Sequence, residues 1–226
     1  MTKRVALETE RILFNGRFPL SRVAANLEEA DGTIRRLDFE VYRHGPAAAA
    51  LLYDPTRACV LLVRQFRLGA HIADGALDTL EVCAGMLDGD APEVCARREI
   101  AEETGVAAKA LTPAFIFYPS PGGSSEIIHC FFAPYAPADR VAKGGGVDAD
   151  EHIDIVEVAF KEALGMIENG AIKDGKTIAL LYAAAARGLI RSRFRTAEMS
   201  DEEAERITSA RMDARHDPLN KPLYPE

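Results

Sequence analysis

Long apolar runs are missing from this chain of 226 residues. No stretch approaches the roughly 18 consecutive apolar residues that a membrane-spanning helix needs. The first residues, MTKRVALETER, become acidic before the hydrophobic region of a signal peptide can develop. Both features argue against a membrane protein and against a secreted one. We therefore expect a cytoplasmic protein with no membrane partner.

A disulfide framework, a cysteine-based metal site and a basic surface are also missing. The cysteines have no CxxC spacing and lie in apolar stretches, at Cys59, Cys83, Cys95 and Cys130. We interpret them as reduced thiols of the core and not as disulfides or zinc ligands. The net charge of −8 and the pI of about 5.3 argue against a broad nucleic-acid surface. We expect no nucleic-acid partner.

The remaining composition is that of an ordinary globular protein, with 48% apolar and 27% charged residues. Residues 1–46 have a strand-like pattern, and Asp31-Gly32 is a strong hairpin signal, so they predict an N-terminal antiparallel β-strand subdomain. This subdomain is rich in charge and has little to bury, so it needs a partner surface. Residues 47–194 form the predicted main domain. Residues 195–226 are a charged tail, either a short helix or disordered.

The main domain mixes strands and helices, which predicts the α/β class. Apolar runs predict strands at 47–54, 58–67 and 79–86, and then two strands around a Pro-Gly loop between 114 and 135. Helical periodicity follows in FKEALGMIENG and in DGKTIALLYAAAARGLIRSRF. Residues 71–78 have the composition of a loop. Residues 144–146 are three glycines, which we interpret as a hinge with little preferred conformation.

The segment 85–106 contains a short acidic helix, around which we expect the active site to be built. Asp90 is predicted to cap its N-terminus, and Glu93, three positions later, completes a capping box. Pro92 fits the first helical turn. Gly105 supplies the left-handed residue that ends the helix.

Three glutamates share one face of this helix. Glu99, Glu102 and Glu103 fall within an arc of about 100°. Like charges at this spacing repel by a few tenths of a kcal/mol per pair, and a divalent cation removes the repulsion. Hard oxygen ligands suit Mg²⁺ or Mn²⁺. The alternative interpretation is an ordinary solvated acidic face.

The order of residues in this helix is similar to a known motif. Residues 98–106, REIAEETGV, resemble the second half of the Nudix box, REUxEExGU with U aliphatic. Gly85 resembles the first glycine of the box but lies one residue closer to Arg98 than in the general pattern. Asp90 or Ala91 stands where the first glutamate of the box would be. The shortened box resembles the branch of the family that hydrolyses GDP-mannose.

The resemblance extends over most of the chain, from about Leu7 to about Ile190. It includes VRQFR at 63–67, YPSPGGSSEIIH at 118–129, GGGVDADE at 144–151 and DGKT at 174–177. It implies a Nudix fold, which is an α/β/α sandwich with a mixed β-sheet. It also implies a homodimer in which the N-terminal subdomain is swapped between two copies.

The resemblance further implies a set of site residues. The implied metal ligands are the carbonyl of Ala84 with Glu99, Glu102, Glu103 and Glu151. The implied catalytic residues are Glu103, Glu99 and Glu151, with Asp148 and Asp150 as weaker candidates for the base. The implied substrate-binding residues are Arg67, Arg64, Glu81 and Lys176. Judged by the residues alone, arginines at a strand end and a lysine near a helix start are as often simply exposed.

The predicted function is that of a Mg²⁺-dependent pyrophosphohydrolase, for which Mn²⁺ is an alternative metal. Its expected substrate is a nucleoside diphosphate sugar, first of all GDP-mannose, with GMP and mannose 1-phosphate as products. The alternative substrate is ADP-ribose, with AMP and ribose 5-phosphate as products. A rival of another class is a nucleotide-binding regulator without catalytic activity, and a purely structural acidic domain is the third possibility.

Overall fold

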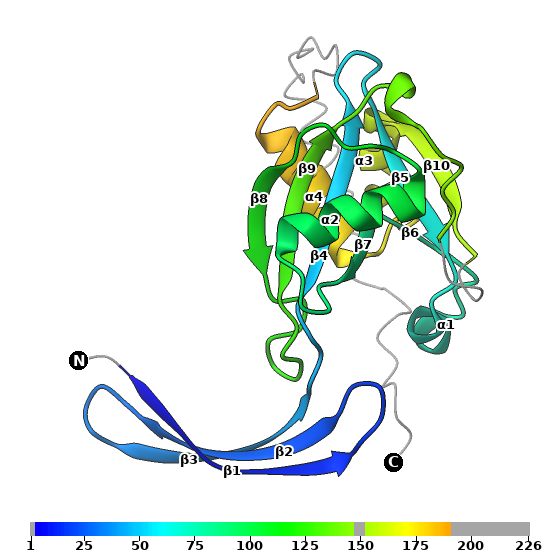
Figure 1. Ribbon diagram of the computed structural model, residues 1–226. Coiled ribbons are helices and arrows are strands. Elements are labelled where there is room, and N and C mark those ends of the chain that lie inside the picture. Colours follow the sequence, from blue (N-terminus) through cyan, green and yellow to red (C-terminus); the bar gives the residue numbers. More distant parts are fainter. Residues whose placement is uncertain (1–2, 147–151, 191–226) are drawn as a thin grey trace, which may run out of the picture. The chain divides into compact units, whose positions relative to one another are not determined.

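The computed structural model describes residues 3–146 and 152–190, which form two separate β-sheets (Figure 1). The first sheet contains β1 (Arg4–Phe14), β2 (Leu20–Glu28) and β3 (Ile34–Tyr42), paired antiparallel in that order. Gly32 has a φ of 85° in the turn between β2 and β3, which confirms the predicted hairpin. Within the described ranges, no helix is long and apolar enough to cross a membrane.

The second sheet is mixed. Its strands are β4 (Ala47–Asp54), β5 (Cys59–Gln65), β6 (Thr79–Glu81), β7 (Cys83–Met86), β8 (Thr112–Phe117), β9 (Ile128–Pro134) and β10 (Asp154–Ala159). They run in the order β10-β5-β4-β9-β8, while β6 pairs with β5 and β7 pairs with β4. The β4 and β9 strands are parallel, and the other pairs are antiparallel.

Helices cover both faces of this sheet. Figure 1 shows α2 (Pro92–Glu99) in front of the strands, with α3 (Phe160–Glu168) and α4 (Gly175–Ala186) behind them. A π-helical turn (Ile100–Thr104) continues α2, and a short 3₁₀ helix (Pro137–Asp139) follows β9. This arrangement confirms the predicted α/β/α sandwich.

The central strand β4 explains why the core has two layers. Its side chains alternate between the faces of the sheet, as they do in any strand. Leu51 packs with Leu180 of α4, whereas Leu52 packs with Ile100 at the end of α2. All four side chains are fully buried, and each contributes about 1.5–3 kcal/mol relative to an exposed position. A strand that is buried on both faces has a continuous apolar sequence, as residues 47–52 do.

The predicted strand 79–86 is divided at Val82, where the pairing partner changes from β5 to β4. Val82 is fully buried, and its N–H donates to the hydroxyl of Thr177 at 2.8 Å. This hydrogen bond satisfies the N–H of Val82, which has no acceptor on a neighbouring strand at the point where the pairing partner changes. It also fixes the first turn of α4 to the strand that leads into the acidic helix.

The prediction of a loop at residues 71–78 is wrong for its first half. Helix α1 (Leu68–Asp74) occupies this stretch and ends at Gly75, which has a φ of 78°. None of its seven residues is buried, so the sequence shows no apolar periodicity to mark a helix. Arg67 is the last extended residue before α1, and its position follows from where this helix begins.

Candidate active site

The acidic helix begins and ends near the predicted residues but is capped differently. Pro92 is its first residue, and Gly105, with a φ of 70°, ends it as expected. The predicted capping box is wrong, because the N-cap is Ala91 and no side chain caps the helix there. Asp90 instead lies 3.6 Å from the guanidinium of Arg98.

The last five residues of the acidic helix form a π turn, Ile100–Thr104. A π turn contains one more residue than an α turn and occurs often at functional sites. The hydroxyl of Thr104 donates to the carbonyl of Ile100 at 2.5 Å inside this turn. Glu102 and Glu103 lie within the turn and Glu99 directly precedes it, so all three predicted carboxylates stay on one side.

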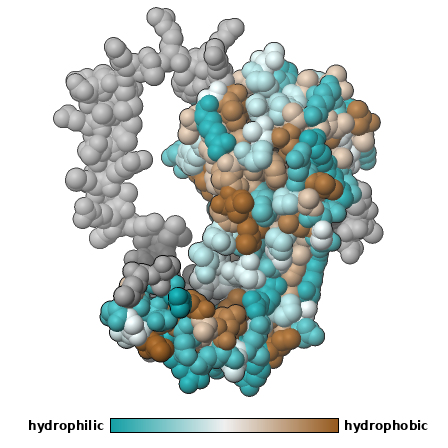
Figure 2. Space-filling model, turned by 60° about the vertical axis from the view of Figure 1, so that its left-hand side comes forward, coloured by the Kyte–Doolittle hydropathy of each residue, from teal (hydrophilic) through white to brown (hydrophobic). Residues whose placement is uncertain are grey.

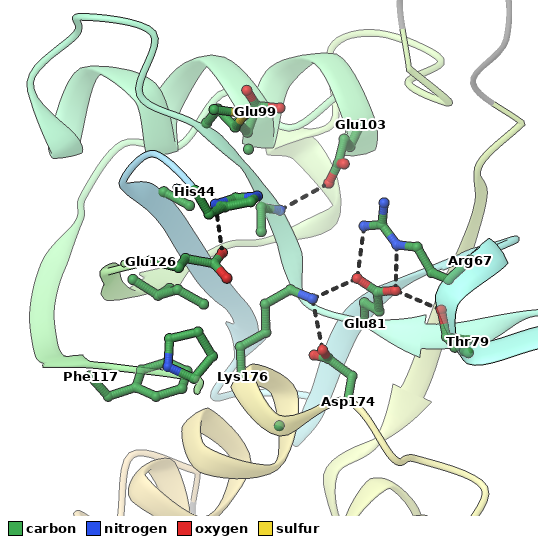
Figure 3. A pocket seen from close by; sticks show the side chains of 18 of the residues that line it. His44, Arg67, Thr79, Glu81, Glu99, Glu103, Phe117, Glu126, Asp174 and Lys176 are labelled. Carbon is green, nitrogen blue, oxygen red and sulfur yellow. Dashed lines mark hydrogen bonds and ion pairs between the residues drawn. The ribbon is translucent and has the colours of Figure 1, made fainter. Parts of the chain in front are cut away.

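These three carboxylates form one wall of a cavity of about 930 Å³. This volume is near the upper end of the range of roughly 300–1,000 Å³ that is typical of small-molecule sites. Figure 3 shows Glu99 and Glu103 on one side of the cavity and Arg67, Glu81 and Lys176 on the other. An acidic wall therefore faces a wall that contains two cations.

Two backbone features bring the carboxylates close to β7. A Cβ atom on Gly85 would lie 2.0 Å from a carboxylate oxygen of Glu99, so only glycine permits this approach. Glu103 is 5% exposed, and its Oε2 accepts a hydrogen bond from the N–H of Ala84 at 3.3 Å. The first glycine of the predicted motif thus lets the Glu99 carboxylate pack directly against the backbone of β7.

Arg98 lies among the carboxylates and partly neutralises them. Its Nη1 is 2.6 Å from Glu99 and 3.3 Å from Glu102, and its Nη2 donates to the carbonyl of Met86. Burial lowers the pKa of Arg98, but the surrounding negative charges outweigh this effect and raise it. Arg98 therefore lies between the carboxylates of Glu99 and Glu102 and holds both by charge.

The donor atoms at this wall fit a hard divalent cation. Carboxylates and a backbone carbonyl next to Gly85 are the ligand types that Mg²⁺ and Mn²⁺ prefer. In the part of the chain that the structure describes, no three His, Cys, Asp or Glu side chains already converge as a ligand set. Mg²⁺ needs only one or two carboxylates, because it keeps several waters and binds substrate phosphates.

The opposite wall is built around Glu81, a carboxylate with 3% exposure. Arg67 donates to both of its oxygens, from Nε at 2.8 Å and from Nη2 at 2.9 Å. Lys176 donates to Oε2 at 2.6 Å, and the hydroxyl of Thr79 donates to Oε1 at 2.6 Å. Burial raises the pKa of Glu81, but Arg67 and Lys176 outweigh it and lower the pKa to about 2.

The three glycines at 144–146 are docked onto the end of the acidic helix and do not form a free hinge. The N–H of Gly145 donates to the carbonyl of Glu103 at 2.8 Å, and the N–H of Gly146 donates to that of Glu102 at 3.1 Å. Gly144 has a φ of 69°, and a Cβ atom there would lie 2.7 Å from the same carbonyl of Glu103. These contacts satisfy carbonyls that a helix end leaves without partners.

Some predicted residues are not brought to the cavity. Arg64 is not among the residues that line it, and its Nε lies 3.7 Å from Asp78. Arg64 is on the paired part of β5, whereas Arg67 lies beyond the end of that strand. Glu151 lies outside the described residues, as do Asp148 and Asp150.

Several residues that line the cavity escaped the sequence interpretation, among them Phe18, His44 and Glu126. The rings of Phe18 and His44 stack with centroids 4.2 Å apart, and His44 lies 3.5 Å from Glu126. Phe18 and His44 flank β2 and β3, far in sequence from the box, and no local pattern marks them as site residues.

Comparison with known proteins agrees with this geometry. The NUDIX domain family matches residues 43–181, and the chain therefore belongs to the Nudix family. The GDP-mannose pyrophosphatase of Cronobacter sakazakii is 42% identical over 193 residues, which cover 84% of this chain and all of that protein. The GDP-mannose pyrophosphatase of Salmonella paratyphi B is 43% identical over 184 residues, covering 80% of this chain and 95% of that protein.

A solved structure supports the fold. The crystal structure of an ADP compounds hydrolase superposes with a TM-score of 0.64 and 18% sequence identity. The superposition covers 84% of this chain and 97% of that chain. At this identity the likeness concerns the fold alone, and it confirms the Nudix fold expected from the sequence.

Because Glu81 is buried and ionised, we expect the effect of Glu81→Gln on the free energy of unfolding to depend on pH. Because the pKa of Glu81 is about 2 in the folded protein and 4.5 ordinarily, its ionised form stabilises the fold above pH 4.5. We expect the variant to lose about 3 kcal/mol of unfolding free energy at pH 7. The loss should shrink as the pH falls from 4.5 towards 2, as measured by urea denaturation.

The matched control for this prediction is Glu93→Gln. Glu93 pairs with Arg97 on the exposed side of α2, with a side-chain exposure of 56%, and such pairs contribute about 0–1 kcal/mol. A stability loss in Glu81→Gln that stayed constant between pH 7 and pH 3 would contradict the ionised cluster.

Proposed function

We propose that this protein is a metal-dependent pyrophosphohydrolase that cleaves GDP-mannose into GMP and mannose 1-phosphate. The assignment of the substrate rests on the 42% identity along the whole length of a relative named GDP-mannose pyrophosphatase. The cavity supports the chemistry, because its acidic and cationic walls suit a metal-bound diphosphate. Membership of the Nudix family supports the dependence on a divalent metal.

The acidic wall is the proposed metal site. Mg²⁺, or Mn²⁺ in its place, would be held by Glu99, Glu102 and Glu103 with the carbonyl of Ala84, and would neutralise the phosphate charge. Glu103 is buried and receives the N–H of Ala84, which fixes the orientation of its carboxylate. We assign Glu151, which lies outside the described residues, to the same set.

The cationic wall is the proposed site for the diphosphate. Glu81 binds the Nε and Nη2 edge of Arg67, so the guanidinium is held with its Nη1 edge toward phosphate oxygens. Lys176 supplies a second fixed cation on the same carboxylate. Glu81 thus contributes to substrate binding by orienting Arg67 and Lys176. Arg64 is not among the described residues that line the cavity, and its part in substrate binding stays a prediction.

The proposed reaction is the attack of water on one phosphorus of the diphosphate. A glutamate accepts the proton of the water, and Glu103, Glu99 and Glu151 are the candidates. The new P–O bond forms as the bridging P–O bond breaks, and the second phosphate leaves as a phosphate monoester. GMP and mannose 1-phosphate together then contain all atoms of GDP-mannose and one water.

ADP-ribose stays the alternative substrate. The likeness to an ADP compounds hydrolase concerns the fold, whereas the relatives with high sequence identity are named for GDP-mannose. A regulator without catalytic activity agrees less well with the cavity, since Glu99, Glu102 and Glu103 all line it.

We also propose the three-part organisation expected from the sequence, with boundaries after residues 46 and 194. The separate sheets support the first boundary, because β3 ends at Tyr42 and β4 begins at Ala47. The tail at 195–226 lies outside the described residues. The cytoplasmic location stays a prediction, as does the lack of nucleic-acid and membrane partners.

The central role of the acidic wall is tested by Glu103→Gln. We expect its turnover of GDP-mannose in Mg²⁺ to fall by a factor of about 10³ or more, since a metal-binding carboxylate is lost while its shape is kept. The measurement is the release of GMP by chromatography, with a thermal melt to verify folding.

The control is again Glu93→Gln, which changes a glutamate of the same helix on its exposed side. This variant should keep the turnover of the wild type. If Glu103→Gln were as active as this control, the acidic helix would have no part in the mechanism.

We propose a homodimer that forms through the N-terminal sheet. All residues of β1 are exposed, and large apolar side chains on this sheet are more than half exposed: Val5, Leu7, Ile12, Phe14, Ile34 and Phe39. Figure 2 shows brown apolar side chains at the surface between teal ones, and an isolated small sheet of this kind is marginally stable in water.

Sedimentation equilibrium at micromolar concentration should give twice the chain mass of 24.6 kDa. Leu7→Asp with Phe14→Asp should shift the mass towards a single chain, because a charge in a buried apolar interface is costly. A wild-type mass near that of one chain would rule out the dimer.

A further inference from the structure

Asp174 uses its two carboxylate oxygens for two different partners. Its Oδ2 caps α4 by accepting the N–H of Thr177 at 2.9 Å and the hydroxyl of Thr177 at 2.5 Å. Its Oδ1 accepts a hydrogen bond from the ammonium of Lys176 at 2.8 Å. One side chain therefore determines both where the helix begins and where the lysine beside it is held.

The capped helix start is itself attached to the sheet. The hydroxyl of Thr177, which donates to Asp174, also accepts the N–H of Val82 at 2.8 Å. Thr177 and Val82 are fully buried, and Val82 lies between Glu81 and the strand that leads to the acidic helix. The position of Asp174 is therefore fixed relative to Glu81 by short contacts.

Lys176 lies between these two carboxylates, as Figure 3 shows. It donates to Glu81 at 2.6 Å and to Asp174 at 2.8 Å, and its side chain has 13% exposure. Burial lowers the pKa of Lys176, but the charges of Glu81 and Asp174 outweigh it and keep the pKa above its ordinary value. The ammonium has three N–H donors, and the two carboxylates engage two of them.

We propose that Asp174 is a positioning residue that acts through Lys176, holding this ammonium where it binds a phosphate oxygen of the substrate. The proposal rests on the proposed function, in which Lys176 contacts the diphosphate. Glu81 alone is insufficient for this task, because it is shared with Arg67 and would draw Lys176 towards that pair. Asp174 supplies the second fixed acceptor that defines the position of the ammonium.

If Asp174 acted only through its own negative charge, its removal would have the opposite effect on substrate binding. A carboxylate in a site for a diphosphate repels the substrate, so its removal on electrostatic grounds alone would tighten binding. If Asp174 positions Lys176, its removal weakens binding instead. The sign of the change in KM therefore distinguishes the two effects.

Asp174→Asn separates the two tasks of this residue. Asparagine caps a helix about as well as aspartate, so α4 should keep its start and the thermal midpoint should stay near that of the wild type. The amide has no negative charge to hold the ammonium. We expect the KM for GDP-mannose to rise by about tenfold with little change in kcat. Asp174→Ser, which also caps well, should show the same rise in KM with little change in kcat.

A double-mutant cycle with Lys176→Gln tests whether Asp174 acts through the lysine. If it does, Asp174→Asn adds nothing in the Lys176→Gln background, because the group that it positions is already gone. Additive effects of the two substitutions, or a fall in KM for Asp174→Asn alone, would overturn the proposal.

The same cycle is measured as affinity for GDP-mannose by titration calorimetry. A wild-type protein that binds GDP-mannose without hydrolysing it would refute the proposed function, and the cycle of affinities would still decide the role of Asp174. A wild-type protein that neither binds nor hydrolyses GDP-mannose would overturn both proposals.

Discussion

The buried carboxylate of Glu81 is the interaction on which the candidate site depends. Glu81 lies on β6, and it binds Arg67 at the start of α1 and Lys176 in the first turn of α4. It therefore joins three parts of the chain. An isolated carboxylate with 3% exposure would be strongly destabilised, so its two cations are required for it to stay ionised. The same requirement places both cations at one wall of the cavity.

The acidic wall packs against the strand segment that follows Val82, where the pairing partner changes. The strand pairs with β5 before this residue and with β4 after it, so the segment that carries Glu81 turns into the one that carries Gly85. Gly85 then receives the carboxylate of Glu99 against its backbone. The carboxylates of the box and the cations of Arg67 and Lys176 thus lie on opposite sides of one cavity, where both can act on a diphosphate.

Local signals in the sequence were sufficient for much of this arrangement. The hairpin at Gly32, the two-sided burial of β4 and the three glutamates of the box each depend on patterns within a few residues. The predicted helix cap was wrong, because Asp90 does not cap its helix but faces Arg98. Arg64 is not among the residues that line the cavity, and its role in substrate binding stays a prediction. The stacked ring of His44 reaches the site from the end of the N-terminal sheet, and no short pattern contains that information.

The central claim is that the two charged walls hydrolyse the diphosphate of GDP-mannose. The most direct measurement is product analysis after incubating the wild-type protein with Mg²⁺ and either GDP-mannose or ADP-ribose, under matched conditions. The account predicts GMP and mannose 1-phosphate as products, formed faster than any AMP and ribose 5-phosphate. Faster release of AMP from ADP-ribose would contradict the substrate, and the absence of products from both would contradict hydrolysis of these diphosphates.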